Sequence, residues 1–290
     1  MVKAFLLILF AGAMLGAPFG SDSKSLLHVE RSSPGDLEVV GDISGQSPDA
    51  TRYVRYEDLL RLPQETYTVS DDSNLSGKTE ISGVPLTVLA RMFGRGADDQ
   101  LIVAVAYDKY RGNYPHDYLV THHPLLVLRV NGQLRDQWPK SIYGGPLGPY
   151  LISHPFFKPA FKVLSHEDEP QIPFGVVRIE LRRESEVFGS IRPRGDWPAD
   201  SAVQKGYVIA RQDCFRCHNM GAEGGTVAGR SWMKLAQKAN EDGERFRQII
   251  RNPESVTPGA TMPAHTDYDD ATVDALTAYF KTFAAARRTP

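Results

Sequence analysis

Residues 214–218 read Cys-Phe-Arg-Cys-His and contain the only two cysteines of the 290-residue chain. Two cysteines separated by two residues and followed directly by a histidine are typical of a c-type haem attachment site. The spacing suits two thioether bonds along one edge of the macrocycle, and the histidine can then bind the iron as an axial ligand. We therefore predict one covalently attached haem c, held by Cys214 and Cys217, with His218 as a ligand of the iron.

Two other uses of a Cys-x-x-Cys pair fit the sequence less well. A redox dithiol is expected in a thioredoxin-like βαβ context, which the sequence around residue 214 does not show. A structural zinc site needs two further Cys or His ligands at short spacing, and the chain has no second cysteine pair. Two inert, buried cysteines would leave the adjacent histidine without a role.

The second axial ligand is predicted in the segment Pro-Gly-Ala-Thr-Met-Pro, residues 258–263. Each proline fixes its own φ and restricts the residue before it, so this loop is expected to be extended and stiff. A methionine on such a loop can ligate the iron, and His/Met ligation raises the reduction potential. A lone methionine more often packs in a core, but this loop is polar and lies outside any periodic apolar run. We predict Met262 as the ligand, with His265 as the alternative.

The segment 200–286 resembles a class I cytochrome c domain. The residues that carry the resemblance are Gly206-Tyr207, the motif at 214–218, Gly224-Gly225, Met262-Pro263 and residues 276–280. The resemblance implies an all-α domain whose first and last helices cross, with Gly206 allowing Tyr279 to approach. The last helix is also indicated by apolar residues at helical spacing, and Asp267 with Asp270 predicts its N-cap.

Residues 24–190 have a different character and predict a β-rich region, so that the whole chain is of the α+β class. Strands are indicated by an apolar run at 101–107, by the segments on either side of Asn131-Gly132, which predicts a type I′ turn, and by alternation at 174–181. Helical patches are expected at 56–61 and 86–93. Residues 191–199, rich in proline and glycine, are expected to be the linker between the two domains.

Histidines at 116, 122 and 123 lie near prolines, and no carboxylate follows them at ligand spacing. We interpret them as ordinary loop residues rather than as a metal site.

The β-rich region is similar to the sulfite-oxidase-type molybdopterin-binding fold over roughly residues 36–183. Four segments carry this resemblance in the same order along the chain: 81–89, 107–110, 127–134 and 144–150. The family binds molybdenum through a cysteine thiolate upstream of the first segment, but this chain has no cysteine before Cys214. Its basic residue in the last segment is replaced by Gly148. We therefore expect no molybdopterin and a domain that serves for docking or as a scaffold.

The first residues predict export. Lys3 precedes an uncharged, largely apolar stretch from 4 to 19, and small residues follow, which is the pattern of a signal peptide over residues 1–20. Its cleavage between 17 and 23 would leave a periplasmic protein, whereas an uncleaved segment would anchor the chain to the membrane. The formal net charge of −2 gives no support for nucleic-acid binding.

These observations together predict a periplasmic mono-haem cytochrome that transfers single electrons between redox partner proteins, such as a dehydrogenase or oxidoreductase and a terminal acceptor. With both axial positions filled, the iron binds no substrate, so we expect an electron carrier without catalytic residues rather than an enzyme. Two alternatives stay open. One is a molybdopterin-type oxidoreductase subunit that passes electrons to its own haem, and the other is a haem-based sensor in which a small ligand displaces Met262.

Overall fold

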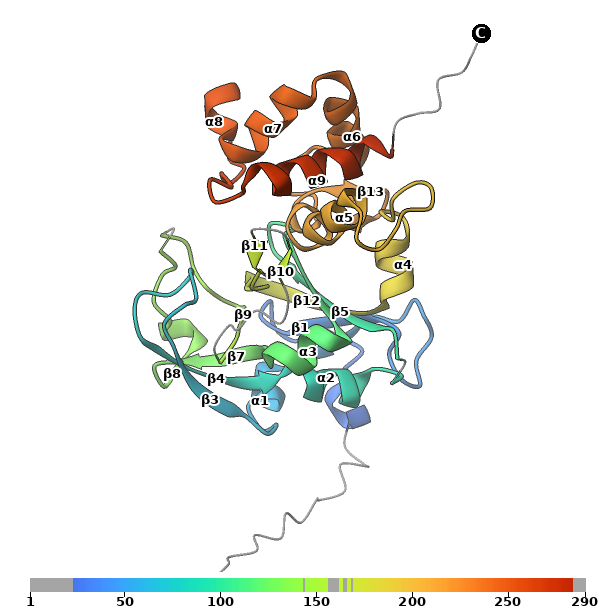
Figure 1. Ribbon diagram of the computed structural model, residues 1–290. Helices are drawn as coiled ribbons and strands as arrows, with labels where there is room; N and C mark the ends of the chain where they lie inside the picture. Colours follow the sequence, from blue (N-terminus) through green and yellow to red (C-terminus); the bar gives the residue numbers. More distant parts are fainter. Residues whose placement is uncertain are drawn as a thin grey trace, which may run out of the picture.

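The computed structural model describes residues 23–96, 98–142, 144–155, 162–163, 166–167 and 169–283. A β-rich part formed by the described residues between 23 and 189 lies against a helical part formed by residues 202–283 (Figure 1). The predicted α+β class, a β-rich region followed by a helical one, is thus confirmed. The predicted signal peptide, residues 1–20, lies outside the described residues.

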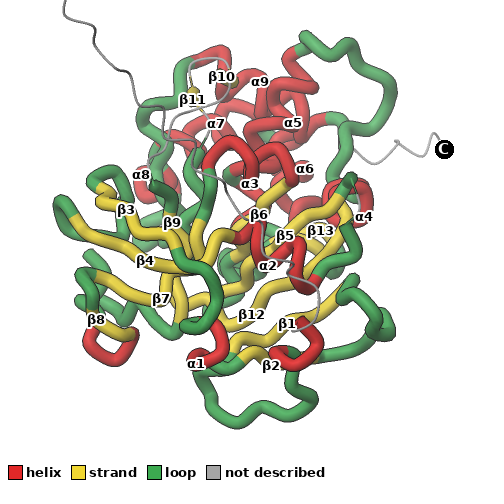
Figure 2. Tube along the Cα trace, turned by 90° about the horizontal axis from the view of Figure 1, so that it is seen from below, coloured by secondary structure: helices red, strands yellow, loops and turns green. Residues whose placement is uncertain are grey.

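The β-rich part is built on one sheet of ten strands among the described residues. Its main path runs in the order β2 (Arg52–Val54), β1 (Leu37–Gly41), β12 (Phe174–Arg183), β9 (Tyr150–Ser153), β7 (Leu125–Val130), β4 (Thr79–Pro85) and β3 (Glu65–Val69). The remaining strands, β5 (Gln100–Ala106), β6 (Arg111–Pro115) and β8 (Gln133–Leu134), pair with β12, β5 and β7. Only β1 and β12 pair in parallel among these strands. Figure 2 shows the helices of the C-terminal part gathered on one side of the strands.

Local sequence explains several of these elements. Asn131 and Gly132 both have positive φ, 49° and 72°, as a type I′ turn requires, and they join β7 to β8 as predicted. The apolar run at 101–107 forms β5 as far as Ala106, and Tyr107 lies in the turn that follows. The side chains of β5 are buried on both faces, because Ile102 and Ala104 point into the core of the β-rich part while Leu101 and Val103 point to the helical part.

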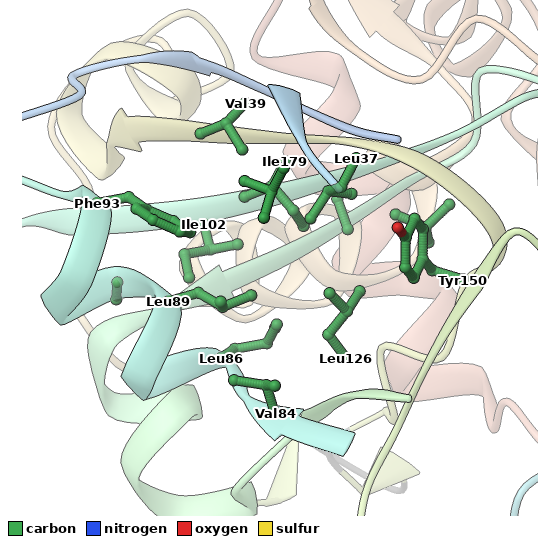
Figure 3. Close-up of a cluster of buried hydrophobic side chains, with 14 of the residues drawn as sticks. Leu37, Val39, Val84, Leu86, Leu89, Phe93, Ile102, Leu126, Tyr150 and Ile179 are labelled. Atoms are coloured by element: carbon green, nitrogen blue, oxygen red, sulfur yellow. The ribbon is translucent and has the colours of Figure 1, made fainter. Parts of the chain in front are cut away.

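The core of the β-rich part lies between the sheet and helix α2 (Leu86–Phe93), as Figure 3 shows. The other helices of this part are α1 (Tyr56–Leu59), α3 (His116–His122) and α4 (Glu184–Gly189). The prediction of loop structure around residues 116–123 was wrong, because residues 116–122 form α3. His123 follows in the left-handed conformation that ends a helix. Buried Leu119 on this helix packs into the core, so tertiary contact outweighs the weak local signal.

The helical part contains α5 (Ala202–Gln212), a 3₁₀ turn (Cys214–Arg216), two short strands β13 (Asn219–Met220) and β14 (Glu223–Gly224), and helices α6 (Trp232–Glu241), α7 (Gly243–Arg251), α8 (Pro253–Val256) and α9 (Asp270–Lys281). Helices α5 and α9 meet at Gly206. A Cβ there would lie 2.0 Å from the carbonyl oxygen of Ala275 and 2.8 Å from Cβ of Tyr279. The predicted close approach of these two helices is confirmed. The N-cap of α9 is Asp269, which accepts a hydrogen bond from the Thr272 amide at 2.8 Å, so the predicted cap at Asp267 was wrong by two residues.

The two parts meet in a second hydrophobic cluster, separate from the core of the β-rich part. Leu101, Val103 and Val105 of β5 join Val187 and Phe188 of α4 and the buried residues of α5, α6, α7 and α9 in a single cluster. The segment 191–199 connects α4 to α5, and its first residue, Ile191, is buried in this cluster. The helical part is therefore packed against the sheet and is not joined to it by the connecting segment alone.

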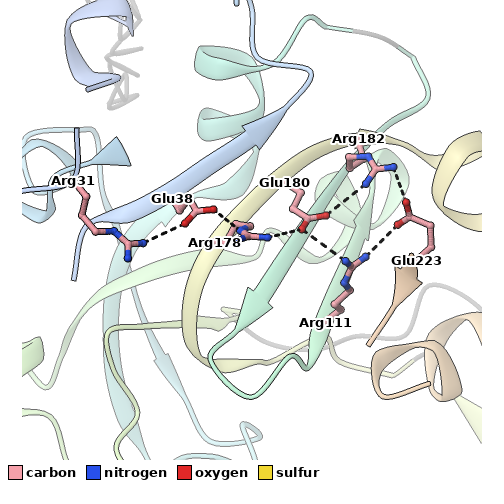
Figure 4. A network of polar contacts seen from close by, with 7 residues as sticks. All are labelled: Arg31, Glu38, Arg111, Arg178, Glu180, Arg182 and Glu223. Atoms are coloured by element: carbon pink, nitrogen blue, oxygen red, sulfur yellow. Dashed lines mark hydrogen bonds and ion pairs between the residues drawn. The ribbon is translucent and has the colours of Figure 1, made fainter. Parts of the chain in front are cut away.

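Charged residues also cross the junction. A row of alternating arginine and glutamate side chains runs along the sheet and ends on Glu223 of β14, as Figure 4 shows. Glu223 pairs with Arg182 at 2.8 Å and with Arg111 at 3.2 Å, and both arginines also face Glu180. Glu223 thus ties the helical part to β12 and to β6, the strands on either side of β5.

Candidate haem site

The motif at residues 214–218 forms one compact turn directly after α5. The amide of Cys217 donates to the carbonyl oxygen of Cys214 at 3.3 Å, and the amide of His218 donates to the same oxygen at 2.9 Å. These two bonds fold the backbone so that both thiols and the imidazole project from a single turn. That is the local arrangement that covalent haem attachment requires.

The turn is fixed by aromatic packing and by glycines. Phe215 is fully buried between Phe188, with ring centroids 6.1 Å apart, and Trp232, at 5.3 Å. Gly224 has φ = +89° and lies directly against the motif turn. A Cβ at this position would lie 2.5 Å from the carbonyl oxygen of His218. A Cβ on Gly225 would lie 1.8 Å from the Arg216 carbonyl oxygen. The two glycines noted in the sequence therefore let the chain pass directly over the turn.

His218 is held as a metal-binding imidazole would be. It is buried, and its Nδ1 lies 2.8 Å from the carbonyl oxygen of Arg230. A carbonyl can only accept, so Nδ1 carries the proton and the lone pair is on Nε2. Burial lowers the pKa of His218, which favours this neutral form. In the described part of the chain Nε2 has no hydrogen-bond partner. An Nδ1–H bound to a backbone carbonyl with Nε2 left to ligate is the usual arrangement of histidine at metal centres.

The thiols do not have the character of a redox pair. Burial raises the pKa of Cys217 to about 11 and raises that of Cys214 as well. Reactive Cys-x-x-Cys pairs depend on a lowered thiol pKa, because the thiolate is the nucleophile. The donor set and its environment fit haem attachment better than dithiol chemistry.

Met262 lies in the loop between α8 and α9 and is half-buried. His265, the alternative ligand, stacks its ring on Tyr268 with centroids 4.6 Å apart. Tyr268 in turn donates to Asp213 at 2.5 Å, so His265 belongs to a packed group beside the motif turn. Because His265 is engaged in this packing, Met262 is favoured as the second ligand. Its role stays a prediction.

Sequence reasoning missed the polar residues that surround the turn. Arg216 pairs with Asp213 at 3.2 Å, and both side chains are nearly covered. Their i, i+3 spacing on either side of Cys214 was a visible signal. Their partners in the β-rich part, Tyr110 and Gln171, carry no such signal in the sequence.

The geometry and the family comparison together define the class. The family described as "Cytochrome C oxidase, cbb3-type, subunit III" matches residues 201–280. The C-terminal part of the chain is therefore a cytochrome c domain, a class that carries covalently bound haem c and transfers electrons.

Two further similarities cover only parts of the chain. The chain is 28% identical over 91 residues to "Cytochrome c oxidase subunit 2" of Alkalihalophilus pseudofirmus (strain ATCC BAA-2126 / JCM 17055 / OF4), which covers 29% of this chain and 26% of that protein. The crystal structure of the sulfane dehydrogenase SoxCD from Paracoccus pantotrophus aligns with 54% of this chain and 41% of its own, with 17% sequence identity and a TM-score of 0.36. The chain thus spans about a quarter of the length of the curated relative that it matches.

Proposed function

We propose that this protein is a periplasmic mono-haem c-type cytochrome that carries single electrons between redox partner proteins, with the β-rich region as a docking or scaffold module. The observation that carries the proposal is the state of His218. Its Nδ1 is bound to the Arg230 carbonyl and its Nε2 is left available, within the Cys-x-x-Cys-His turn of a cytochrome c domain.

The chain's own residues divide the work. Cys214 and Cys217 would hold the macrocycle by thioethers, and His218 and Met262 would be the protein ligands of the iron. The haem, when bound, supplies a one-electron couple. The residues set its potential through ligand identity, burial and hydrogen bonding. An iron bound on both faces has no open position, so the protein exchanges electrons rather than transforming a substrate.

The β-rich region is proposed to work without molybdenum. The loop at 69–74, where the resemblance leads one to expect a thiolate, instead holds the buried carboxylate of Asp72. One oxygen of this carboxylate accepts from Ser153 Oγ at 2.5 Å and the other from the Asn74 amide at 2.8 Å. A carboxylate that is already satisfied in this way does not replace a soft thiolate ligand. These contacts support a structural role for Asp72 in the region.

The periplasmic location rests on the pattern of residues 1–20 and on the haem-attachment motif. Among the residues that the structure describes, no helix is long and apolar enough to cross a bilayer.

A pyridine haemochrome assay, combined with elemental analysis for iron and molybdenum on protein from a host that attaches haem, tests the proposal. We expect one haem c and one iron per chain and no molybdenum. Stoichiometric molybdenum would establish the oxidoreductase alternative instead. Rapid binding of carbon monoxide by the reduced protein at neutral pH would establish the sensor.

The axial assignment has its own test. Met262→Ala is expected to abolish the charge-transfer absorbance of a methionine-ligated ferric haem and to lower the midpoint potential, because a thioether favours the reduced iron. An unchanged spectrum and potential would show that another residue ligates the iron, and His265→Ala would then be the next variant.

A further inference from the structure

A buried ion pair lies inside the haem-attachment turn. The guanidinium of Arg216, between the two cysteines, contacts Asp213 Oδ1 at 3.2 Å, and the two side chains are only 13% and 6% exposed. Arg216 Nε also donates to the carbonyl oxygen of Gln212 at 2.6 Å. A solvent-facing arginine would be the ordinary outcome at this position, since arginine is rarely buried unless it is paired.

The arginine reaches into the β-rich part. The charge of its guanidinium acts on the hydroxyl of Tyr110, in the turn between β5 and β6, and opposes the rise that burial causes in the pKa of this hydroxyl. With its amide oxygen facing the guanidinium, Gln171 accepts from Nη2 of Arg216 at 2.7 Å and from Nε at 3.2 Å. Nearby, the Thr226 amide donates to the Lys109 carbonyl oxygen at 3.4 Å. The haem turn is thus held by the β-rich part through side chains and backbone.

Asp213 contacts the loop that carries Met262. Its Oδ2 accepts from the hydroxyl of Tyr268 at 2.5 Å, and Tyr268 is buried. The Tyr268 ring stacks on His265, and the His265 amide donates to the carbonyl oxygen of Ile250 at 3.1 Å. Tyr268 is therefore a fixed point six residues after Met262.

These contacts connect loops of the β-rich part, through the haem turn, to the loop that carries Met262. Each ion among them is removed from water, so the loss of any partner leaves a poorly compensated charge. An apolar contact permits small displacements, whereas a guanidinium that donates from two nitrogens and a carboxylate with a defined donor favour one geometry. Such contacts suit the task of fixing one element relative to another.

We propose that Arg216, Asp213 and Tyr268 form a brace that positions the Met262 loop over the haem turn, and that Tyr110 and Gln171 make the β-rich region a part of this brace. These are positioning residues, since they act through the loop and the turn rather than on the iron. The inference rests on the proposed function, because it takes Met262 as the axial ligand. According to this inference, the β-rich region helps to position the haem ligands in addition to docking partner proteins.

The affinity of the ferric protein for added imidazole tests the brace, because imidazole binds the iron only when the methionine ligand dissociates. Tyr268→Phe keeps the stacked ring and removes only the hydroxyl. We expect full covalent haem attachment and an affinity for imidazole raised roughly tenfold, the effect of losing one hydrogen bond to a charged group.

Tyr279→Phe is the matched control. Its hydroxyl is equally buried in the helical part, accepts from Trp232 Nε1 at 3.1 Å and lies outside the brace. We expect this variant to be less stable than the wild type but to bind imidazole with wild-type affinity. Equal affinities for imidazole in the two variants would overturn the brace, because general loosening would then explain both.

The contribution of the β-rich part is tested by Gln171→Leu, which removes the amide oxygen that accepts from Arg216 and changes no residue of the cytochrome domain. We expect its imidazole affinity to rise severalfold, and a wild-type value would refute the involvement of the β-rich region. Met262→Ala separates the two proposals. If it leaves the spectrum unchanged, the axial assignment fails, whereas if only Tyr268→Phe has no effect, the brace alone fails.

Discussion

Replacement of Glu223 by glutamine should loosen the junction between the two parts of the protein. Glu223 lies 2.8 Å from Arg182 and 3.2 Å from Arg111, and its side chain is 16% exposed. Glutamine keeps the shape of the side chain and removes the charge. The two arginines would then share Glu180, which lies 3.7 Å from one and 3.8 Å from the other.

The magnitude follows from the distances and the burial. At these separations and an effective dielectric constant of about 20, one pair gains roughly 5 kcal/mol of Coulomb energy before desolvation. Desolvation offsets most of this gain. Exposed pairs contribute less than about 1 kcal/mol, and breaking a buried pair costs about 3–5 kcal/mol. Glu223 lies between these cases, so we expect a loss of about 2 kcal/mol in the free energy of unfolding, or roughly 4–8 °C in Tm.

Glu186→Gln is the matched control, because it removes the same charge from the same arginine. Glu186 is 53% exposed and lies 3.7 Å from Arg182, so its loss should cost less than about 0.5 kcal/mol. Thermal unfolding of the holoprotein, followed by the haem absorbance, compares the two variants. Equal Tm values for the two would show that the junction pairs behave as ordinary surface ions, and the reasoning from burial would be refuted.

Two further predictions concern packing and pH. Gly206→Ala should destabilise the protein by at least ~3 kcal/mol, since its Cβ would meet a carbonyl oxygen at 2.0 Å, whereas Gly189→Ala, with nothing within 4 Å, should be neutral or slightly stabilising by thermal unfolding. Burial, with a smaller effect of nearby His122, lowers the pKa of His154 to about 3. As the pH falls from 7 to 5, His154 therefore becomes protonated in the unfolded chain but stays neutral in the folded chain. The free energy of unfolding should then fall by about 2 kcal/mol. His154→Gln should flatten this part of the stability–pH curve measured by urea unfolding, and an unchanged slope would show that other groups cause it.

The elements that local sequence determines were predicted correctly. The turn at Asn131-Gly132 and the strand at 101–107 depend on residues close together in the chain. The start of α9 was predicted wrongly at Asp267, because Asp267, Asp269 and Asp270 are equally suitable caps by residue type. The structure selects Asp269, one residue after Tyr268, whose ring and hydroxyl are already engaged with His265 and Asp213.

The residues that surround the haem turn could not be predicted from local sequence, because they come from distant parts of the chain. The motif at 214–218 indicates the cofactor and three of its attachment points from five residues. The burial of Arg216 depends on Tyr110 and Gln171, which lie 106 and 45 positions earlier in the sequence. Likewise, β5 is recognisable as a strand, but the pattern does not reveal that its second face covers the cytochrome domain.

The hydrophobic cluster between the two parts changes how the β-rich region can serve electron transfer. A domain joined by a flexible linker raises the local concentration of its partner but leaves their orientation free. Here Ile191 is buried at the start of the connection, and β5, α4 and the haem turn pack on one another, so the orientation is fixed. A partner that docks on the β-rich region would then meet the haem domain at one distance and from one side. The face of the motif turn that carries Phe215 and Arg216 is already covered, so electrons must enter and leave through other parts of the haem domain's surface.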